Sequence, residues 1–191
     1  MDDIAEIDRV RDLALRSIGR NVVAFQKMEG MLKFLVANHR IQGLPEKLLE
    51  IKEQNRRVVE RQTMGSLVDK FFRSVAVDRS SVQTSSDDVA GEMSAIFNVE
   101  MDAGAHDEIR KAFLLVVEER NALIHRMLVR FNPNSLDSCQ EISDLMESQR
   151  ERLKPHYEYL KSIVKAILEG QRELLDFMES EAFPRMLDGG S

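Results

Sequence analysis

Three polar residues that could do chemistry lie within one short stretch of the chain: Arg120, Asn121 and His125. Arginine presents a rigid fork of donors to phosphate oxygens, and histidine titrates close to neutral pH, so it can accept or donate a proton. Asparagine can orient the histidine or bond a phosphate oxygen. These residue types are suited to phosphate-ester chemistry that uses side chains alone.

The periodicity predicts one strong helix from about Ala105 to Arg130 that carries these residues. At 100° per residue Arg120 falls on one apolar line of the helix surface, and Asn121 and His125 fall on a neighbouring line. The apolar members of the two lines are Ile109, Phe113, Val116, Leu123 and Met127, then Leu114, Val117 and Leu128. A buried polar group without a partner costs roughly 1–3 kcal/mol. The cluster therefore forms either a mutually bonded structural layer or part of a cleft between helices or subunits.

Charged residues flank this cluster on both sides. Glu118 and Glu119 precede it, and Glu118 lies one turn from Asn121, where it could hold His125 or Arg120. Its alternative role is a solvated charge at the rim of a cleft. Arg126 and Arg130 follow and could guide a phosphate backbone, or they could simply face solvent and complement the helix dipole.

The run Arg120-Asn121-Ala122-Leu123-Ile124-His125 resembles the Arg-x4-6-His motif of the HEPN superfamily, small helical bundles that include many metal-independent ribonucleases. The stretch from Gly19 to Glu29 is similar to the long opening helix of some members. The resemblance implies an all-α, up-and-down bundle of four to five main helices. It also implies an endoribonuclease without a cofactor, in which Arg120, Asn121 and His125 are catalytic; Arg126 and Arg130, which follow the motif, are our candidates for contacts to the RNA.

The implied reaction is attack of the RNA 2′-hydroxyl on the neighbouring phosphate, which leaves a 2′,3′-cyclic phosphate and a 5′-hydroxyl. It needs both a base and an acid, and a two-fold homodimer that brings two His125 side chains to one cleft would supply them. A toxin branch of the superfamily carries a modifiable tyrosine two residues after the motif histidine. Met127 stands there instead, so neutralisation through that tyrosine is not supported.

Several functional settings remain open. A HEPN-type nuclease would suit a toxin–antitoxin pair, phage defence or a stress response, with an antitoxin or regulatory protein as a possible partner. The first alternative is a catalytically inactive HEPN bundle that binds a nucleotide or a protein. The second is a plain helical scaffold in which Arg120, Asn121 and His125 fix the register of a dimer.

The remaining elements that must position the cluster are also mainly helical. We expect helices over about 4–38, 45–61 and 136–181 and a short helical patch near 67–72, with Pro155 either kinking the last helix or dividing it. These form a single domain over 1–183, in which 78–102 is a loop or insertion. Residues 95–102 could be extended, but we find no partner strand long enough for a sheet. Residues 184–191 are expected to be a disordered tail.

Composition narrows the possible partners. The 191 residues are 43% hydrophobic and 31% charged, with a net charge of -6. A broad nucleic-acid surface is usually basic, so contact with RNA must be local. The only cysteine, Cys139, excludes an internal disulfide, and His39, His106 and His156 form no metal-ligand spacing and are interpreted as surface or capping residues. The acidic start and the lack of a long apolar run favour the cytoplasm over a membrane.

Overall fold

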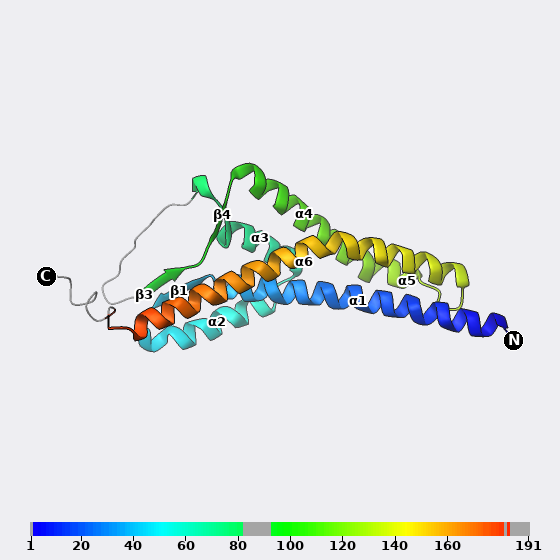
Figure 1. Ribbon diagram of the computed structural model, residues 1–191, viewed down its shortest axis with the longest axis horizontal. Helices are drawn as coiled ribbons and strands as arrows, with labels where there is room; N and C mark the ends of the chain where they lie inside the picture. The colour runs from blue at the N-terminus through cyan, green and yellow to red at the C-terminus, as the bar shows by residue number, and fades with distance from the viewer. Residues whose placement is uncertain (1, 82–92, 182, 184–191) are drawn as a thin grey trace.

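Two long helices form the axis of the protein. The computed structural model describes residues 2–81, 93–181 and 183. Helices α1 (Asp2–Asn38) and α6 (Leu136–Glu179) lie side by side along the longest dimension and run in the same direction (Figure 1). Two hydrogen bonds confirm that the helices are parallel. Asn21 of α1 donates to the Met146 carbonyl of α6, and further along both helices Gln171 of α6 donates to the Asn38 carbonyl of α1.

Three shorter segments complete the bundle. They are α2 (Leu48–Glu60), α3 (Met64–Ser74) and α4 (Ala103–Ala122), which continues through the π-helix η3 (Leu123–Met127) into α5 (Leu128–Arg130). Successive main helices alternate in direction, so α1, α3 and α6 run one way and α2 and α4 the other (Figure 1). The predicted all-α, up-and-down bundle of four to five main helices is therefore confirmed, with five.

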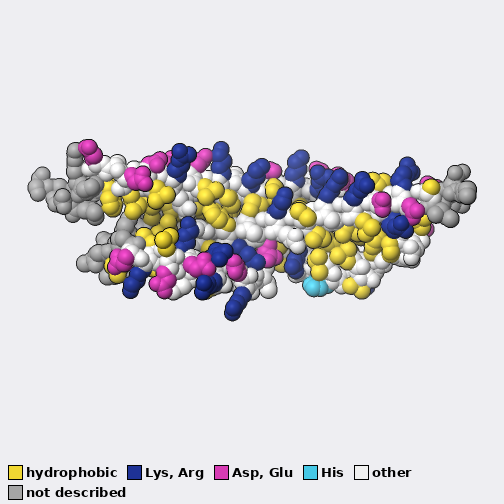
Figure 2. Space-filling model, turned by 90° about the horizontal axis from the view of Figure 1, so that it is seen from below, with side chains coloured by type: hydrophobic (Ala, Val, Ile, Leu, Met, Phe, Trp, Pro, Cys, Tyr) yellow, Lys and Arg dark blue, Asp and Glu magenta, His cyan; other side chains and the backbone are white. Residues whose placement is uncertain are grey.

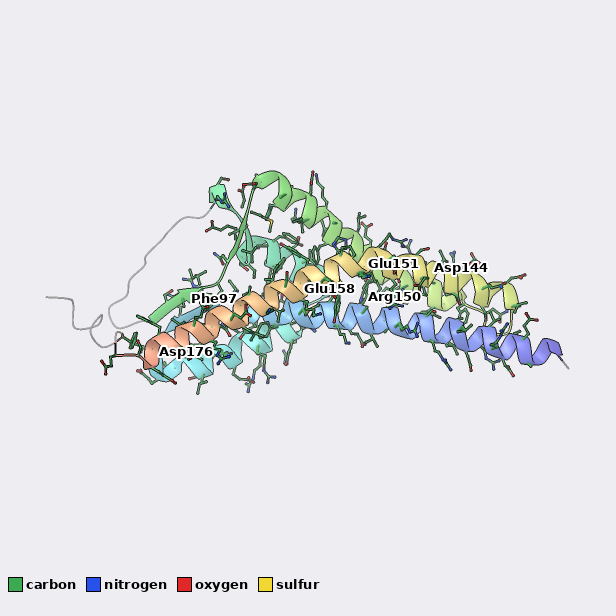
Figure 3. The ribbon with its side chains drawn as sticks, viewed as in Figure 1. Phe97, Asp144, Arg150, Glu151, Glu158 and Asp176 are labelled. Carbon is green, nitrogen blue, oxygen red and sulfur yellow. The ribbon has the colours of Figure 1, made fainter. Side chains whose placement is uncertain are left out.

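Local sequence explains where the later helices begin. The Thr63 hydroxyl accepts from the Ser66 N–H at the start of α3, and the Ser135 hydroxyl accepts from the Ser138 N–H at the start of α6. Pro155 lies inside α6 and does not divide it. The helix changes direction in this region, between the labelled residues Glu151 and Glu158 (Figures 1 and 3). Of the two expectations for Pro155, the kink is therefore correct.

The core lies where α3 and α4 pack against the two long helices. Ile18, Phe25 and Leu32 of α1 are buried in this core, and Val22 and Val36 on the same helix are half-buried against it. Phe71 and Phe72 of α3 meet Phe113 of α4, with ring centroids 6.3 and 5.6 Å apart. This aromatic contact fixes the distance between the two shorter helices and so the position of α4.

Short strands close the end of the bundle opposite to α5. Strand β1 (Arg40–Gly43) pairs antiparallel with β3 (Met93–Ile96), and β2 (Ala76–Asp78) pairs in parallel with β4 (Val99–Met101). The expectation that the 95–102 segment lacks partner strands was wrong. The partners have three or four residues each and lie far away in the sequence, so no alternation pattern reveals them.

Two glycines allow close approaches at this end. Gly43 has a φ of 143°, and a Cβ there would lie 2.5 Å from the Ile51 side chain of α2. Gly170 of α6 faces the ring of Phe97, which lies between β3 and β4 (Figure 3). A Cβ at position 170 would lie 3.1 Å from the nearest carbon of that ring. The strand segments are thereby held tightly on α2 and α6.

The 78–102 segment, expected to be a loop or insertion, contains the 3-10 turn η2 (Arg79–Ser81), β3 and β4. Residues 82–92 within it and the tail 184–191 lie outside the described residues. None of the helices in the described part of the chain combines the length and the apolar character needed to cross a membrane.

Candidate functional site

The Arg120-Asn121-His125 motif lies at the C-terminal end of α4, where the helix changes its geometry. Arg120 and Asn121 belong to the last turn of α4, and His125 lies within η3. The Leu128 N–H donates to the Leu123 carbonyl five residues earlier, which is the hydrogen bond of a π-turn. Such turns are rare and frequently occur at functional sites. The uniform projection used on the sequence therefore does not hold across His125.

Burial of α4 differs between its two apolar lines. The first line is buried at Phe113, Val116 and Leu123, whereas Leu114, Val117 and Leu128 of the second are only half-buried. On the first line, Arg120 keeps 35% of its side chain exposed. On the second, Asn121 and His125 are exposed. The desolvation cost expected for a buried cluster does not arise in the single chain, and the motif is not an internal structural layer.

Arg120 is the motif residue most firmly held. Its Nη1 donates to Asn121 Oδ1 at 3.2 Å, and its Nη2 lies 4.0 Å from Glu29 Oε2 on α1. The other oxygen of Glu29 accepts from Lys33 Nζ at 2.8 Å. Glu29 thus links the guanidinium to α1.

His125 stands apart from the other two residues. Within the described part of the chain its ring makes no hydrogen bond or ion pair, and it is exposed. Arg120 and Asn121 are bonded to each other, but neither orients the imidazole. The arrangement offers an accessible proton carrier five residues after Arg120, and no acid or base among the described residues is hydrogen-bonded to the histidine.

The two carboxylates that precede the motif have different environments. Glu118 is exposed and makes no hydrogen bond to Arg120 or His125 among the described contacts. Glu119 faces α6, where its Oε1 accepts from Arg152 Nε at 2.6 Å and its Oε2 is buried without a hydrogen-bond partner in the described structure. Glu119 therefore anchors α4 to α6 rather than contacting the motif side chains.

The two arginines after the motif are both exposed. Arg130 lines a hollow of about 150 Å³ with Met127 and Phe131. Val129, one turn after His125, is 78% exposed. Figure 2 shows exposed hydrophobic side chains on both halves of one face, including the half toward the N-terminal end of the molecule. The motif therefore lies near apolar surface that the single chain leaves uncovered.

A buried polar network lies beneath the motif. Asn21 of α1 donates through Nδ2 to Gln149 Oε1 at 3.0 Å and to the Met146 carbonyl at 2.8 Å. Gln149 Nε2 in turn donates to the carbonyl of Glu119, directly before Arg120, at 3.5 Å. Sequence analysis gave Gln149 no role. Its position in the sequence could have indicated that it is buried. Gln149 follows Ile142 by seven residues and precedes Leu153 by four, so it lies on the apolar face of α6.

The other histidines occupy structural positions. His39 lies just after α1 with Nδ1 3.0 Å from the Val36 carbonyl, and His106 Nε2 lies 2.9 Å from the Phe72 carbonyl near the end of α3. His156 is half-buried, and its ring centroid lies 5.3 Å from that of Phe113. Burial lowers the pKa of His156 below 6.5, and the charge of Glu119 opposes this shift.

No group of three or more His, Cys, Asp or Glu side chains in residues 2–81 and 93–181 is arranged to hold a metal ion. Comparisons of the chain with protein-family models, curated proteins and solved structures found no match.

Proposed function

We propose that this chain is a metal-independent endoribonuclease of HEPN type that acts as a homodimer. The observation that carries the proposal is an exposed imidazole, His125, on a π-turn five residues after an arginine whose guanidinium lies 4.0 Å from Glu29 of α1. A scaffold role would not require an unpartnered histidine, whereas proton transfer to a substrate requires an accessible one.

In the proposed reaction the 2′-oxygen of RNA attacks the adjacent phosphorus and the bond from phosphorus to the 5′-oxygen breaks. One His125 takes the proton of the 2′-hydroxyl, and the second, from the other subunit, protonates the leaving 5′-oxygen. Arg120 stabilises the charge on the phosphoryl oxygens, because its fork can donate two parallel hydrogen bonds. Asn121, bonded to Arg120, keeps that fork oriented.

The dimer places helix 105–130 of each subunit against its counterpart across a two-fold axis. Two features of the single chain support this arrangement: the histidine has no acid–base partner in the described chain, and Val129 next to it is exposed. The exposed Arg126 and Arg130 would contact the RNA backbone locally, which is compatible with a net charge of -6.

The proposed setting is the cytoplasm, with RNA as the substrate. Control by an antitoxin or regulatory protein would make the chain a toxin or defence protein. Met127 stands in place of the modifiable tyrosine, so this control would not use modification at that position.

The decisive experiment compares RNA cleavage by the wild-type protein, His125→Ala and Lys111→Ala. Lys111 is an exposed residue of α4 outside the motif and serves as the matched control. Loss of His125 should lower the rate by about 10²–10⁴-fold, the usual contribution of a general acid or base, with an unchanged melting temperature. Lys111→Ala should cleave like wild type.

Two further substrates and one additive sharpen this test. RNA with a 2′-O-methyl group at the cleaved position and DNA of the same sequence should resist cleavage, and EDTA should have no effect. Cleavage that needs added Mg²⁺ or persists in purified His125→Ala would overturn the mechanism. A folded wild-type protein that cleaves no RNA would favour the alternative, an inactive bundle that binds a nucleotide or a protein.

A further inference from the structure

A hollow with an unusual charge lies away from the motif, between the end of α1, β1, α2 and α3. Its volume is about 530 Å³, which is within the usual range of small-molecule sites. Its charged lining consists of Arg40, Lys70 and Arg73, and no described Asp or Glu lines it. Four other hollows on the described surface each include a carboxylate. In a chain with a net charge of -6, such a concentration of positive charge is notable.

The nearby carboxylates are already engaged elsewhere. Glu53 of α2 binds both Arg56 and Arg57, with N–O distances of 2.9 and 3.0 Å. Asp69, beside Lys70 in the sequence, binds Arg110 at 2.9 Å. As a result, Arg40, Lys70 and Arg73 form no ion pair with any described residue. Three like charges that share one hollow repel one another, so an anion would be bound favourably there.

The rest of the lining is apolar or weakly polar. Val36, Ile51 and Val58 supply aliphatic surface, and Asn55 and Ser74 supply groups that can form hydrogen bonds. The wall is rigidly built, because Gly43 lets β1 approach Ile51 of α2 more closely than any residue with a Cβ would allow. A ligand that fits this lining carries a negative group at one end and an apolar body at the other.

We propose that this hollow binds a small phosphate ester, whose phosphate lies between Arg40, Lys70 and Arg73 and whose organic part packs on Val36, Ile51 and Val58. A phosphate dianion suits three cations better than a carboxylate does, and guanidinium forks match its tetrahedral oxygens. The hollow shares no lining residue with the Arg120-Asn121-His125 motif. Phosphate-ester binding in this hollow can therefore be tested independently of ribonuclease activity.

Calorimetric titration of the full chain with phenyl phosphate tests the proposal, because this probe carries both halves of the ligand. One molecule should bind per chain, at least tenfold more tightly than inorganic phosphate, and benzyl alcohol should not bind. Arg40→Gln and Arg73→Gln should each weaken binding at least tenfold. The matched control is Arg56→Gln, which removes an exposed arginine of α2 outside the hollow and should bind like wild type. Val58→Ser should reduce the preference for phenyl phosphate over inorganic phosphate.

Circular dichroism and melting temperatures establish that each variant is folded. Absence of binding to wild type at millimolar phenyl phosphate would overturn the proposal, since Arg40 and Arg73 would then only complement the C-terminal dipoles of α1 and α3. Equal affinity for inorganic phosphate would also overturn it, because the apolar wall would contribute nothing. So would tight competition by a short single-stranded RNA, which would make the hollow part of an RNA-binding surface.

Discussion

Arg120 is held by groups on two helices, and this decides how it can be tested. Its two terminal nitrogens reach Asn121 and Glu29, so the guanidinium spans two partners and still keeps a third of its surface exposed. A lysine ammonium is a compact charge and cannot maintain both contacts while it binds a phosphate. Partly exposed ion pairs contribute at most about 1 kcal/mol to stability. The substitution should therefore affect chemistry much more than folding.

For Arg120→Lys we expect RNA cleavage to fall at least tenfold while the melting temperature stays within a few degrees of wild type. Arg110→Lys is the matched control, because Arg110 lies on the same helix and pairs with Asp69 away from the motif. It should cleave at the wild-type rate. If Arg120→Lys keeps full activity, a point charge is sufficient and Arg120 has no bidentate role.

His156 and His39 predict a pH dependence of stability. Burial lowers the pKa of each below 6.5, so the folded protein binds these protons less readily than the unfolded chain. Below pH 6.5 the unfolded state therefore holds more protons, and stability must decrease as the pH falls. The Glu53 and Asp78 carboxyls, whose pKa values are lowered from 4.5 and 3.8, add to the loss only under more acidic conditions.

We expect the melting temperature to decrease between pH 7.5 and 5, and to decrease less in His156→Phe. Phenylalanine keeps the aromatic contact with Phe113 but cannot be protonated. Lys111→Ala is the control, because it replaces an exposed residue of α4 outside the core and outside the motif. If the melting temperature changes with pH equally in His156→Phe and wild type, protonation of His156 does not affect the stability of the fold.

At the scale of elements, the junction between α4 and α5 determines where the motif residues point. In a continuous α-helix Asn121 and His125 would lie about 40° apart around the axis, since residues advance by about 100° each. The π-turn over Leu123–Met127 inserts one extra residue into that turn. It changes the direction of His125 relative to Arg120 while α5 continues along the same axis.

Deletion of Ile124 should therefore convert the π-turn into α-helix. We expect a folded protein with equal or higher stability and RNA cleavage reduced to the level of His125→Ala, because the imidazole moves to another side of the helix. Ile124→Ala keeps the chain length and should retain activity. Equal cleavage by the deletion variant and wild type would indicate that the π-turn has no part in the site.

The sequence predicts elements well where periodicity is long, and poorly where structure depends on distant partners. The first and last helices were expected at 4–38 and 136–181 and occur at Asp2–Asn38 and Leu136–Glu179, because many apolar positions repeat along each. Strand β1, by contrast, has four residues and pairs about fifty residues away, with β3. A π-turn cannot be recognised in a hydrophobic pattern that is projected at a constant 100° per residue.

The sequence identifies the candidate residues but not how exposed they are. Arg120, Asn121 and His125 interrupt apolar lines, which the sequence reveals. That the second line lies at the edge of the core depends on how α4 packs against α3 and α6, which no local pattern determines. The links from Asn21 through Gln149 to the Glu119 carbonyl likewise need three helices to be in place.

For the whole molecule, the main prediction concerns assembly. A single chain presents one motif histidine at its surface, and the proposed reaction needs two proton carriers at one phosphate. The exposed side chain of Val129, one turn after His125, would be covered if two α4–α5 segments met across a two-fold axis. An interface that buries apolar surface near the motif would also exclude water from the reacting phosphate.

Sedimentation equilibrium at micromolar concentration should give the mass of a homodimer, twice 21.9 kDa. Val129→Asp should yield folded monomers that no longer cleave RNA, because burial of a carboxylate at the interface carries a large desolvation cost. Leu168→Asp is the matched control: Leu168 is 49% exposed on the C-terminal half of α6, remote from α5, and its replacement should preserve both the dimer and the activity.

A wild-type chain that remains monomeric yet cleaves RNA would remove the basis for a two-histidine site, since one His125 would then have to act as both acid and base. Dissociation by Leu168→Asp instead of Val129→Asp would place the interface on α6 and leave the motif outside it.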